Sequence, residues 1–140
     1  MTILADYIIE RLIQIEVGVH YSEIPPPGRQ PFVILDRNSP IILSAPHGAR
    51  TFRFNDDEIW HEEDEYTASM VLMLSDLCQT SVIATIWRTE ESDPNEHPEN
   101  RSSYKRELRR LVEQGRIRWL IDLHGASITS KNLASVQFSR

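Results

Sequence analysis

The sequence has little cysteine and no long apolar run. Its single cysteine, Cys78, has no partner within the chain for a disulfide. No apolar stretch reaches the roughly 18 residues that a membrane-spanning helix needs, and no basic segment followed by an apolar stretch begins the chain. These absences argue against a disulfide-stapled domain, a membrane protein and a cleaved leader, so we expect a soluble, cytoplasmic protein.

Positive charge is also scarce. Fifteen Lys and Arg against 21 Asp and Glu give a net charge of -6, which offers no general attraction for nucleic acid or anionic lipid. We expect no nucleic-acid or membrane partner, and a small-molecule substrate is compatible with this charge. The 40% hydrophobic and 26% charged content fits one compact domain over residues 1–140. Within it, residues 1–30 are expected to form an N-terminal helix and a proline-rich connector.

Apolar spacing divides the chain into helices and strands. Three segments repeat apolar residues at the period of one helical face, and we predict helices at 4–13, 63–77 and 104–112, the last ended by Gly115. Four short apolar or β-rich runs predict strands at 32–35, 41–45, 82–87 and 117–123. This order predicts an α/β fold with a mostly parallel or mixed sheet flanked by helices.

The second helix is the most strongly periodic. Its apolar residues recur at helical spacing: Tyr66, Met70, Met73, Leu74 and Leu77. This pattern predicts an amphipathic helix with that face toward the core. Cys78 falls on the same side, and because a free cysteine behaves as a small hydrophobe, we expect it to be buried.

Two predicted strands end in the same dipeptide, one at His47-Gly48 and the other at His124-Gly125. The carboxyl ends of strands in an open α/β sheet form the crevice where ligands bind. Glycine permits a tight turn and the close approach of a ligand or backbone. We therefore expect His47 and His124 to lie at this edge, where Asp122 is positioned to orient an imidazole or a bound water.

The two histidines suit a divalent metal. A catalytic zinc commonly has three protein ligands, and the run Glu62-Glu63-Asp64 offers the third, from Asp64 or Glu63. No HxxxH or HExxH grouping forces the ligands together. Each feature also has a plainer interpretation: a His-Gly pair as an ordinary turn, and the acidic run as charge at a helix N-terminus.

Four short motifs follow one another in a distinctive order: Ser44-Ala45-Pro46-His47-Gly48, Glu63-Asp64-Glu65-Tyr66-Thr67, Arg88 before Asp93-Pro94-Asn95, and Ile121-Asp122-Leu123-His124-Gly125. This succession resembles the N-formylglutamate amidohydrolase-like family, with residues 31–126 as the family-like core. The resemblance implies a zinc-exopeptidase-like α/β fold and hydrolysis of a formamide bond by a metal-activated water. It also implies one zinc ion held by His47, His124 and Asp64, with Glu63 as the rival acidic ligand.

The family's substrate-binding loop is altered in this sequence. In the family an arginine suited to a substrate carboxylate follows the asparagine, whereas Glu96 follows Asn95 here. The resemblance therefore leaves Arg88 or Arg101 to supply the positive charge, with Asn95 as a further substrate-binding residue. Arg101 also fits a solvated residue near a helix start.

The family's late catalytic acid is missing as well. About 15 residues follow Gly125, and none after Asp122 is acidic. A zinc hydrolase needs a general base and acid, so Glu62, Glu63 or Asp122 is expected to substitute.

Three functions remain open from the sequence. The favoured one is hydrolysis of a small N-formyl or N-acyl amino acid. The alternatives are a truncated, non-catalytic relative that binds a metal or ligand, and an interaction domain with structural histidines. Self-association through the apolar first helix is a further alternative to its packing on its own domain.

Overall fold

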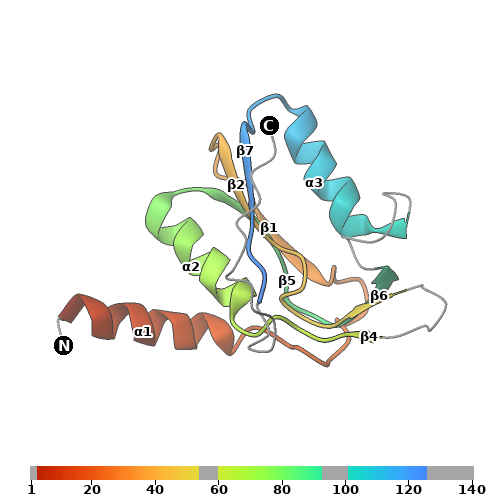
Figure 1. Ribbon diagram of the computed structural model, residues 1–140, viewed down its shortest axis with the longest axis horizontal. Helices are drawn as coiled ribbons and strands as arrows, with labels where there is room; N and C mark the ends of the chain where they lie inside the picture. The colour runs from red at the N-terminus through yellow and green to blue at the C-terminus, as the bar shows by residue number, and fades with distance from the viewer. Residues whose placement is uncertain (1–2, 54–59, 93–100, 126–140) are drawn as a thin grey trace, which may run out of the picture.

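The computed structural model describes residues 3–53, 60–92 and 101–125 as an α/β fold (Figure 1). Its elements, in chain order, are α1 (Ile3–Glu16), β1 (Phe32–Leu35), β2 (Ile41–Ala45), β3 (Thr51–Phe52), β4 (Trp60–His61), α2 (Thr67–Cys78), β5 (Ser81–Thr85), β6 (Thr89–Ser92), α3 (Ser103–Glu113) and β7 (Trp119–Asp122). The prediction of an α/β fold with a mixed sheet flanked by helices is confirmed.

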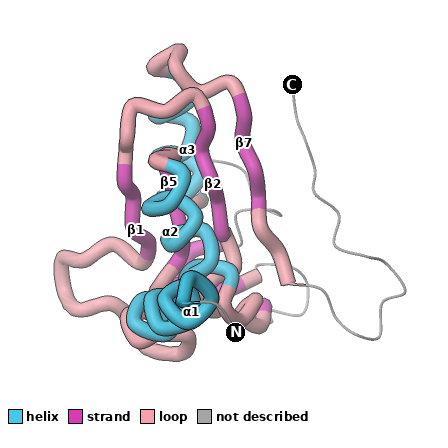
Figure 2. Tube along the Cα trace, turned by 90° about the vertical axis from the view of Figure 1, so that its left-hand side faces the viewer, coloured by secondary structure: helices cyan, strands magenta, loops and turns pink. Residues whose placement is uncertain are grey.

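The main sheet has four strands in the order β1-β5-β2-β7 (Figure 2). Strand β2 runs parallel to β5 on one side and to β7 on the other, while β1 pairs antiparallel with β5. The chain therefore leaves β2 for one neighbour and later returns to its other side as β7. In an open α/β sheet, ligands bind at such a point, beyond the carboxyl ends of the strands.

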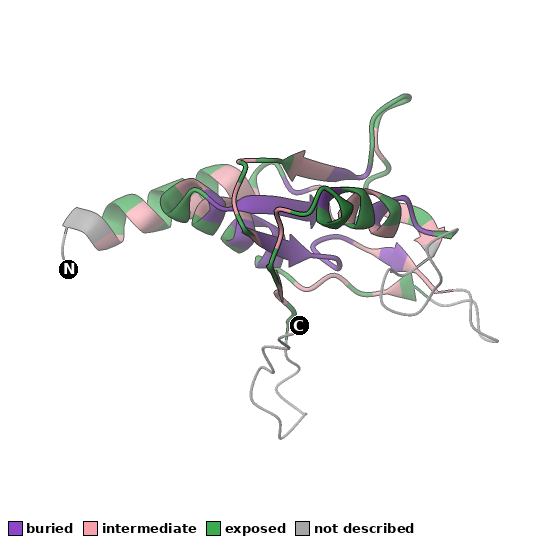
Figure 3. Ribbon diagram, turned by 90° about the horizontal axis from the view of Figure 1, so that it is seen from above, coloured by how far each residue is buried: buried purple, intermediate pink, exposed green. Residues whose placement is uncertain are grey.

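Helices α2 and α3 cover opposite faces of this sheet, and α1 packs against α2 (Figure 1). Side chains alternate along each strand, so Leu43 and Ala45 of β2 pack toward α2, while Ile42 packs toward α3 with Tyr104 and Leu111. The buried strands between the helices form the centre of the molecule (Figure 3). This rigid double-sided core fixes the ends of β2 and β7.

Helix α2 differs from its prediction in which face it buries. The residues that face inward are small or polar: Thr67, Ala68, Ser69, Val71 and Ser75. Tyr66 and Leu77 are each 52% exposed. Small side chains let the helix lie close to the sheet, and the large apolar ones lie at its flank, some of them beside α1.

Two expectations for this helix are therefore wrong. Its apolar stripe does not form the contact with the sheet, and Cys78, the last residue of α2, is exposed rather than buried. The helix also begins at Thr67 instead of Glu63, because Tyr66 adopts a left-handed conformation with φ 66°. The acidic run thus belongs to the loop before α2.

A second, small sheet was not predicted. Strands β4, β3 and β6 pair in that order beside the carboxyl edge of the main sheet. Two of these strands have only two residues each, too few for an alternating pattern to be recognised. Among the described residues, no helix is long and apolar enough to cross a membrane.

Candidate metal centre

His47 and His124 lie beyond adjacent strand ends. Each comes two residues after its strand, β2 or β7. The two strands are parallel with Ser44 beside Asp122, and the amide of Leu123 donates to the carbonyl of Ser44 at 2.8 Å. Both histidines therefore occupy the carboxyl edge, as the sequence predicted.

Asp64 reaches this edge through its backbone. Its amide donates to the carbonyl oxygen of His47 at 2.8 Å, which ties the loop before α2 to the end of β2. Its own carbonyl accepts bonds from Thr67, from the amide at 3.2 Å and from the hydroxyl Oγ1 at 2.6 Å. The start of α2 thus fixes Asp64 on both sides.

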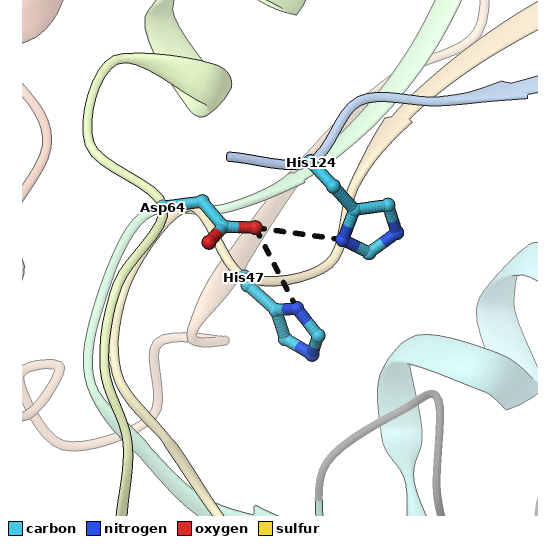
Figure 4. A group of neighbouring side chains, drawn as sticks. All are labelled: His47, Asp64 and His124. Carbon is cyan, nitrogen blue, oxygen red and sulfur yellow. Dashed lines mark ion pairs between the residues drawn. The ribbon is translucent and has the colours of Figure 1, made fainter. Parts of the chain in front are cut away.

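The three side chains form a group that can hold a metal ion. Oδ2 of Asp64 lies 3.7 Å from Nδ1 of His47 and 3.4 Å from Nδ1 of His124 (Figure 4). One donor atom from each residue lies within 4.8 Å of the others. Two ligand atoms about 2.1 Å from a tetrahedral zinc are separated by about 3.4 Å, so the spacing fits a shared ion.

The group is closed on one side and open on the other. His47 is only 3% exposed, whereas the His124 side chain is 35% exposed. Partial burial raises the pKa of Asp64, but the neighbouring imidazoles of His124 and His47 and the backbone of Gly125 outweigh it and hold the pKa well below its usual value. Asp64 therefore offers the group an anionic carboxylate that is partly shielded from water.

Glycine after each histidine leaves room for a close neighbour, and the neighbour differs between the two positions. A Cβ on Gly48 would overlap the carbonyl oxygen of Thr85 and the side chain of Ala68. A Cβ on Gly125 would instead meet the carboxylate of Asp64, 2.9 Å from Oδ1. The first glycine permits packing of the core, and the second permits the close approach of the Asp64 carboxylate.

The other acidic candidates do not join the group. Glu63 points to Arg50, whose Nε donates to Oε2 at 2.6 Å. Burial raises the pKa of Glu63, and the Arg50 guanidinium more than offsets it, so the pKa is lowered overall. Glu62 is exposed. Asp64, rather than either glutamate, is the residue brought to both histidines.

Asp122 lies on β7, where the strand ends, so strict alternation does not carry through to His124. Its register partner Ser44 shares a 2.7 Å hydrogen bond with the hydroxyl of Tyr104. The pKa of Tyr104 is raised, first by burial and then by the negative charge of Asp122. Asp122 therefore lies toward α3 and is not one of the three grouped donors.

The predicted substrate-binding residues are placed unequally. The guanidinium carbon of Arg88 lies 4.9 Å from the ring centroid of Trp60, and its Nε is buried with no hydrogen-bond partner in the described part of the chain. Arg101 is exposed just before α3. Asn95 and Glu96 lie outside the described residues.

His61 is a residue that the sequence analysis missed. Its ring stacks on that of His47, with centroids 4.0 Å apart and 21° between the planes. It lies on the two-residue strand β4, which no periodicity reveals. The one feature of the sequence that could have pointed to His61 is its position three residues before Asp64.

The chain was compared with protein-family models, curated proteins and solved structures, and none of them matches it.

Proposed function

We propose that this protein is a metal-dependent hydrolase of the N-formylglutamate amidohydrolase type, acting on a small N-formyl or N-acyl amino acid. The observation that carries the proposal is the convergence of His47, Asp64 and His124 at the switch point of the sheet, with one donor atom of each within 4.8 Å of the others. The succession of four motifs in the sequence supports the same reaction class and a zinc-exopeptidase-like fold.

Two imidazoles and one carboxylate suit zinc, which accepts nitrogen and oxygen donors and keeps a fourth position open in catalytic sites. A divalent ion supplies Lewis acidity and lowers the pKa of water bound to it. Within the chain, His47 and Asp64 form the fixed side of the site, and the exposed His124 leaves an approach from solvent. That arrangement suits a small substrate.

The proton acceptor that we propose is Glu63, with Asp122 as the alternative. Glu63 adjoins Asp64 in the chain, is half-buried, and is held by Arg50. Asp122 lies beside the buried hydroxyl pair of Tyr104 and Ser44. A carboxylate that acts in this way must come within hydrogen-bond reach of the reacting water.

Arg88 is the cation that we propose for the carboxylate of an amino-acid substrate. It follows β5 at the same edge of the sheet, and Trp60 covers its guanidinium group. A guanidinium with a buried donor binds a carboxylate through charge-assisted hydrogen bonds.

Metal analysis and a formate-release assay test the proposal together. Protein purified without a metal-affinity tag should bind one zinc ion, and the double variant His47→Ala, His124→Ala should bind none. Formate release from N-formylglutamate and a panel of formyl and acyl amino acids should disappear in the same variant. The control is His20→Ala, which removes a histidine stacked on Trp87 and outside the group. Absence of zinc binding in the unaltered protein would refute the site.

A binding module without turnover is the second candidate. The ion pair of Glu63 with Arg50 favours this candidate, because it occupies the carboxylate that we propose as the proton acceptor. If the protein binds one zinc ion but releases no formate or other acid from any of the formyl and acyl amino acids assayed, the binding function is the correct one.

A further inference from the structure

We infer that His61 is a positioning residue for the metal centre: its ring, stacked on that of His47, holds the ligand imidazole in its binding orientation. The inference rests on the proposed metal site and names a residue that supports one ligand. It is carried by the stacking geometry, with ring centroids 4.0 Å apart and planes inclined by 21°.

A ligand histidine needs such support because its last torsion is soft. The χ2 angle of histidine has a broad distribution, so backbone placement alone does not aim a ring nitrogen. In His47 the backbone is well fixed, since its carbonyl accepts from Asp64 and that of Pro46 accepts from Thr85. The backbone does not fix the rotation of the His47 ring about χ2, and His61 restrains this rotation by stacking on the face of the ring.

His61 is itself held in place. In the β3–β4 ladder His61 pairs with Thr51, and Thr51 lies only four residues after His47 in the chain. This pairing brings His61 back over the ring of His47. Its Nδ1 also lies within hydrogen-bond distance of the carbonyl oxygen of Glu62. The ring plane of His61 is therefore set by local contacts, and it gives His47 a flat surface on which to pack.

The ring of His47 has two imidazole neighbours in different orientations. His124 packs on His47 edge-on, with centroids 5.2 Å apart and an angle of 61°. His47 is thus covered on a ring face by His61 and approached by His124 from another direction. Side chains that orient metal ligands typically change metal affinity by 10- to 100-fold when removed.

The test compares zinc affinity in two variants, measured by competition with a chromophoric chelator. His61→Ala removes the stacking ring and should weaken zinc binding about tenfold. His61→Phe retains a flat ring but no nitrogen donor and should bind zinc within about threefold of the unaltered protein. The absorption spectrum of the cobalt-loaded protein should change in the alanine variant and be restored in the phenylalanine variant.

The matched control is His20→Ala, which removes a comparable stack, with His20 on Trp87 at 3.6 Å and 10°, and should leave zinc affinity unchanged. Urea unfolding in chelator separates loss of fold from loss of metal. Equal weakening in His61→Ala and His61→Phe would make His61 a direct ligand and overturn the inference. Unchanged affinity in His61→Ala would overturn it too, whereas a lack of zinc binding in the unaltered protein would refute the proposed function itself.

Discussion

The two His-Gly pairs have the same sequence and opposite surroundings. His47-Gly48 is buried between β5 and the start of α2, where Gly48 touches Thr85 and Ala68. His124-Gly125 follows β7, which has β2 as its only partner strand among the described residues and ends at an exposed histidine. The first pair is part of the core, and the second lies at its rim.

This difference separates two roles that a ligand residue can have. At His47 the same side chain belongs to the fold and to the site, whereas at His124 it serves the site alone. Asp64 joins the pairs, because its backbone bonds to His47 and its carboxylate faces both imidazoles. Substitutions at matched positions of the pairs should therefore have unequal effects on stability and metal binding.

The largest effect is expected from Gly48→Ala. The added Cβ meets backbone oxygen and a short side chain, neither of which can move aside, so unfolding free energy should fall by about 3 kcal/mol. Urea denaturation in the presence of chelator measures it. A variant as stable as the unaltered protein would mean that the first pair is not packed as described.

The next largest effect is the contrast between His47→Ala and His124→Ala without metal. Loss of the buried ring should destabilise the protein by about 2 kcal/mol, because it leaves a cavity, while loss of the exposed ring should cost under about 0.5 kcal/mol. Both variants should lose zinc. Equal destabilisation by the two substitutions would erase the distinction between core and rim.

Much of this comparison was predictable from the sequence. The bounds of β1 and β2, the end of α3 near Gly115 and the placement of both histidines at one sheet edge follow from local patterns. The carboxyl ends of parallel strands lie at the same edge of a sheet, however far apart the strands are in the sequence. Two His-Gly pairs that each follow an apolar run were therefore enough to predict that both histidines lie at one edge.

The remaining features depend on contacts that no local pattern encodes. The sequence favours Asp64 but keeps Glu63 as a rival ligand, and only the hydrogen bond from the Asp64 amide to His47 and the left-handed turn at Tyr66 bring Asp64 alone to the histidines. The orientation of α2 was mispredicted because close approach to the sheet selects small side chains, not the most apolar stripe. The position of His61 beside His47 depends on the pairing of β3 with β4, two strands too short to predict from the sequence.

The third prediction concerns Asp64, the residue shared by both pairs. Its pKa is lowered in the folded state relative to about 3.9 in the unfolded chain, so the unfolded state takes up the proton first as the pH falls. Asp64 therefore contributes stability that is present above about pH 4 and is lost as the pH falls toward its folded pKa, at no more than about 1.4 kcal/mol per pH unit. The difference in unfolding free energy between the metal-free protein and Asp64→Asn should shrink below pH 4. A difference independent of pH there would contradict the assigned ionic contacts.

The smallest effect is expected from Gly125→Ala, the counterpart of the first substitution. Its Cβ meets the side chain of Asp64, whose carboxylate can rotate away and whose Cβ, at 3.1 Å, has to shift by only a few tenths of an ångström, so unfolding free energy in chelator should change by less than about 0.5 kcal/mol. The rotation moves a ligand, however, and zinc affinity should fall about fivefold, or about 1 kcal/mol. Chelator competition and urea denaturation on the same preparation measure the two quantities. If Gly125→Ala instead lost stability as Gly48→Ala does, the rim pair would be a second part of the core, and the exposure of His124 would no longer mark it as a residue of the site alone.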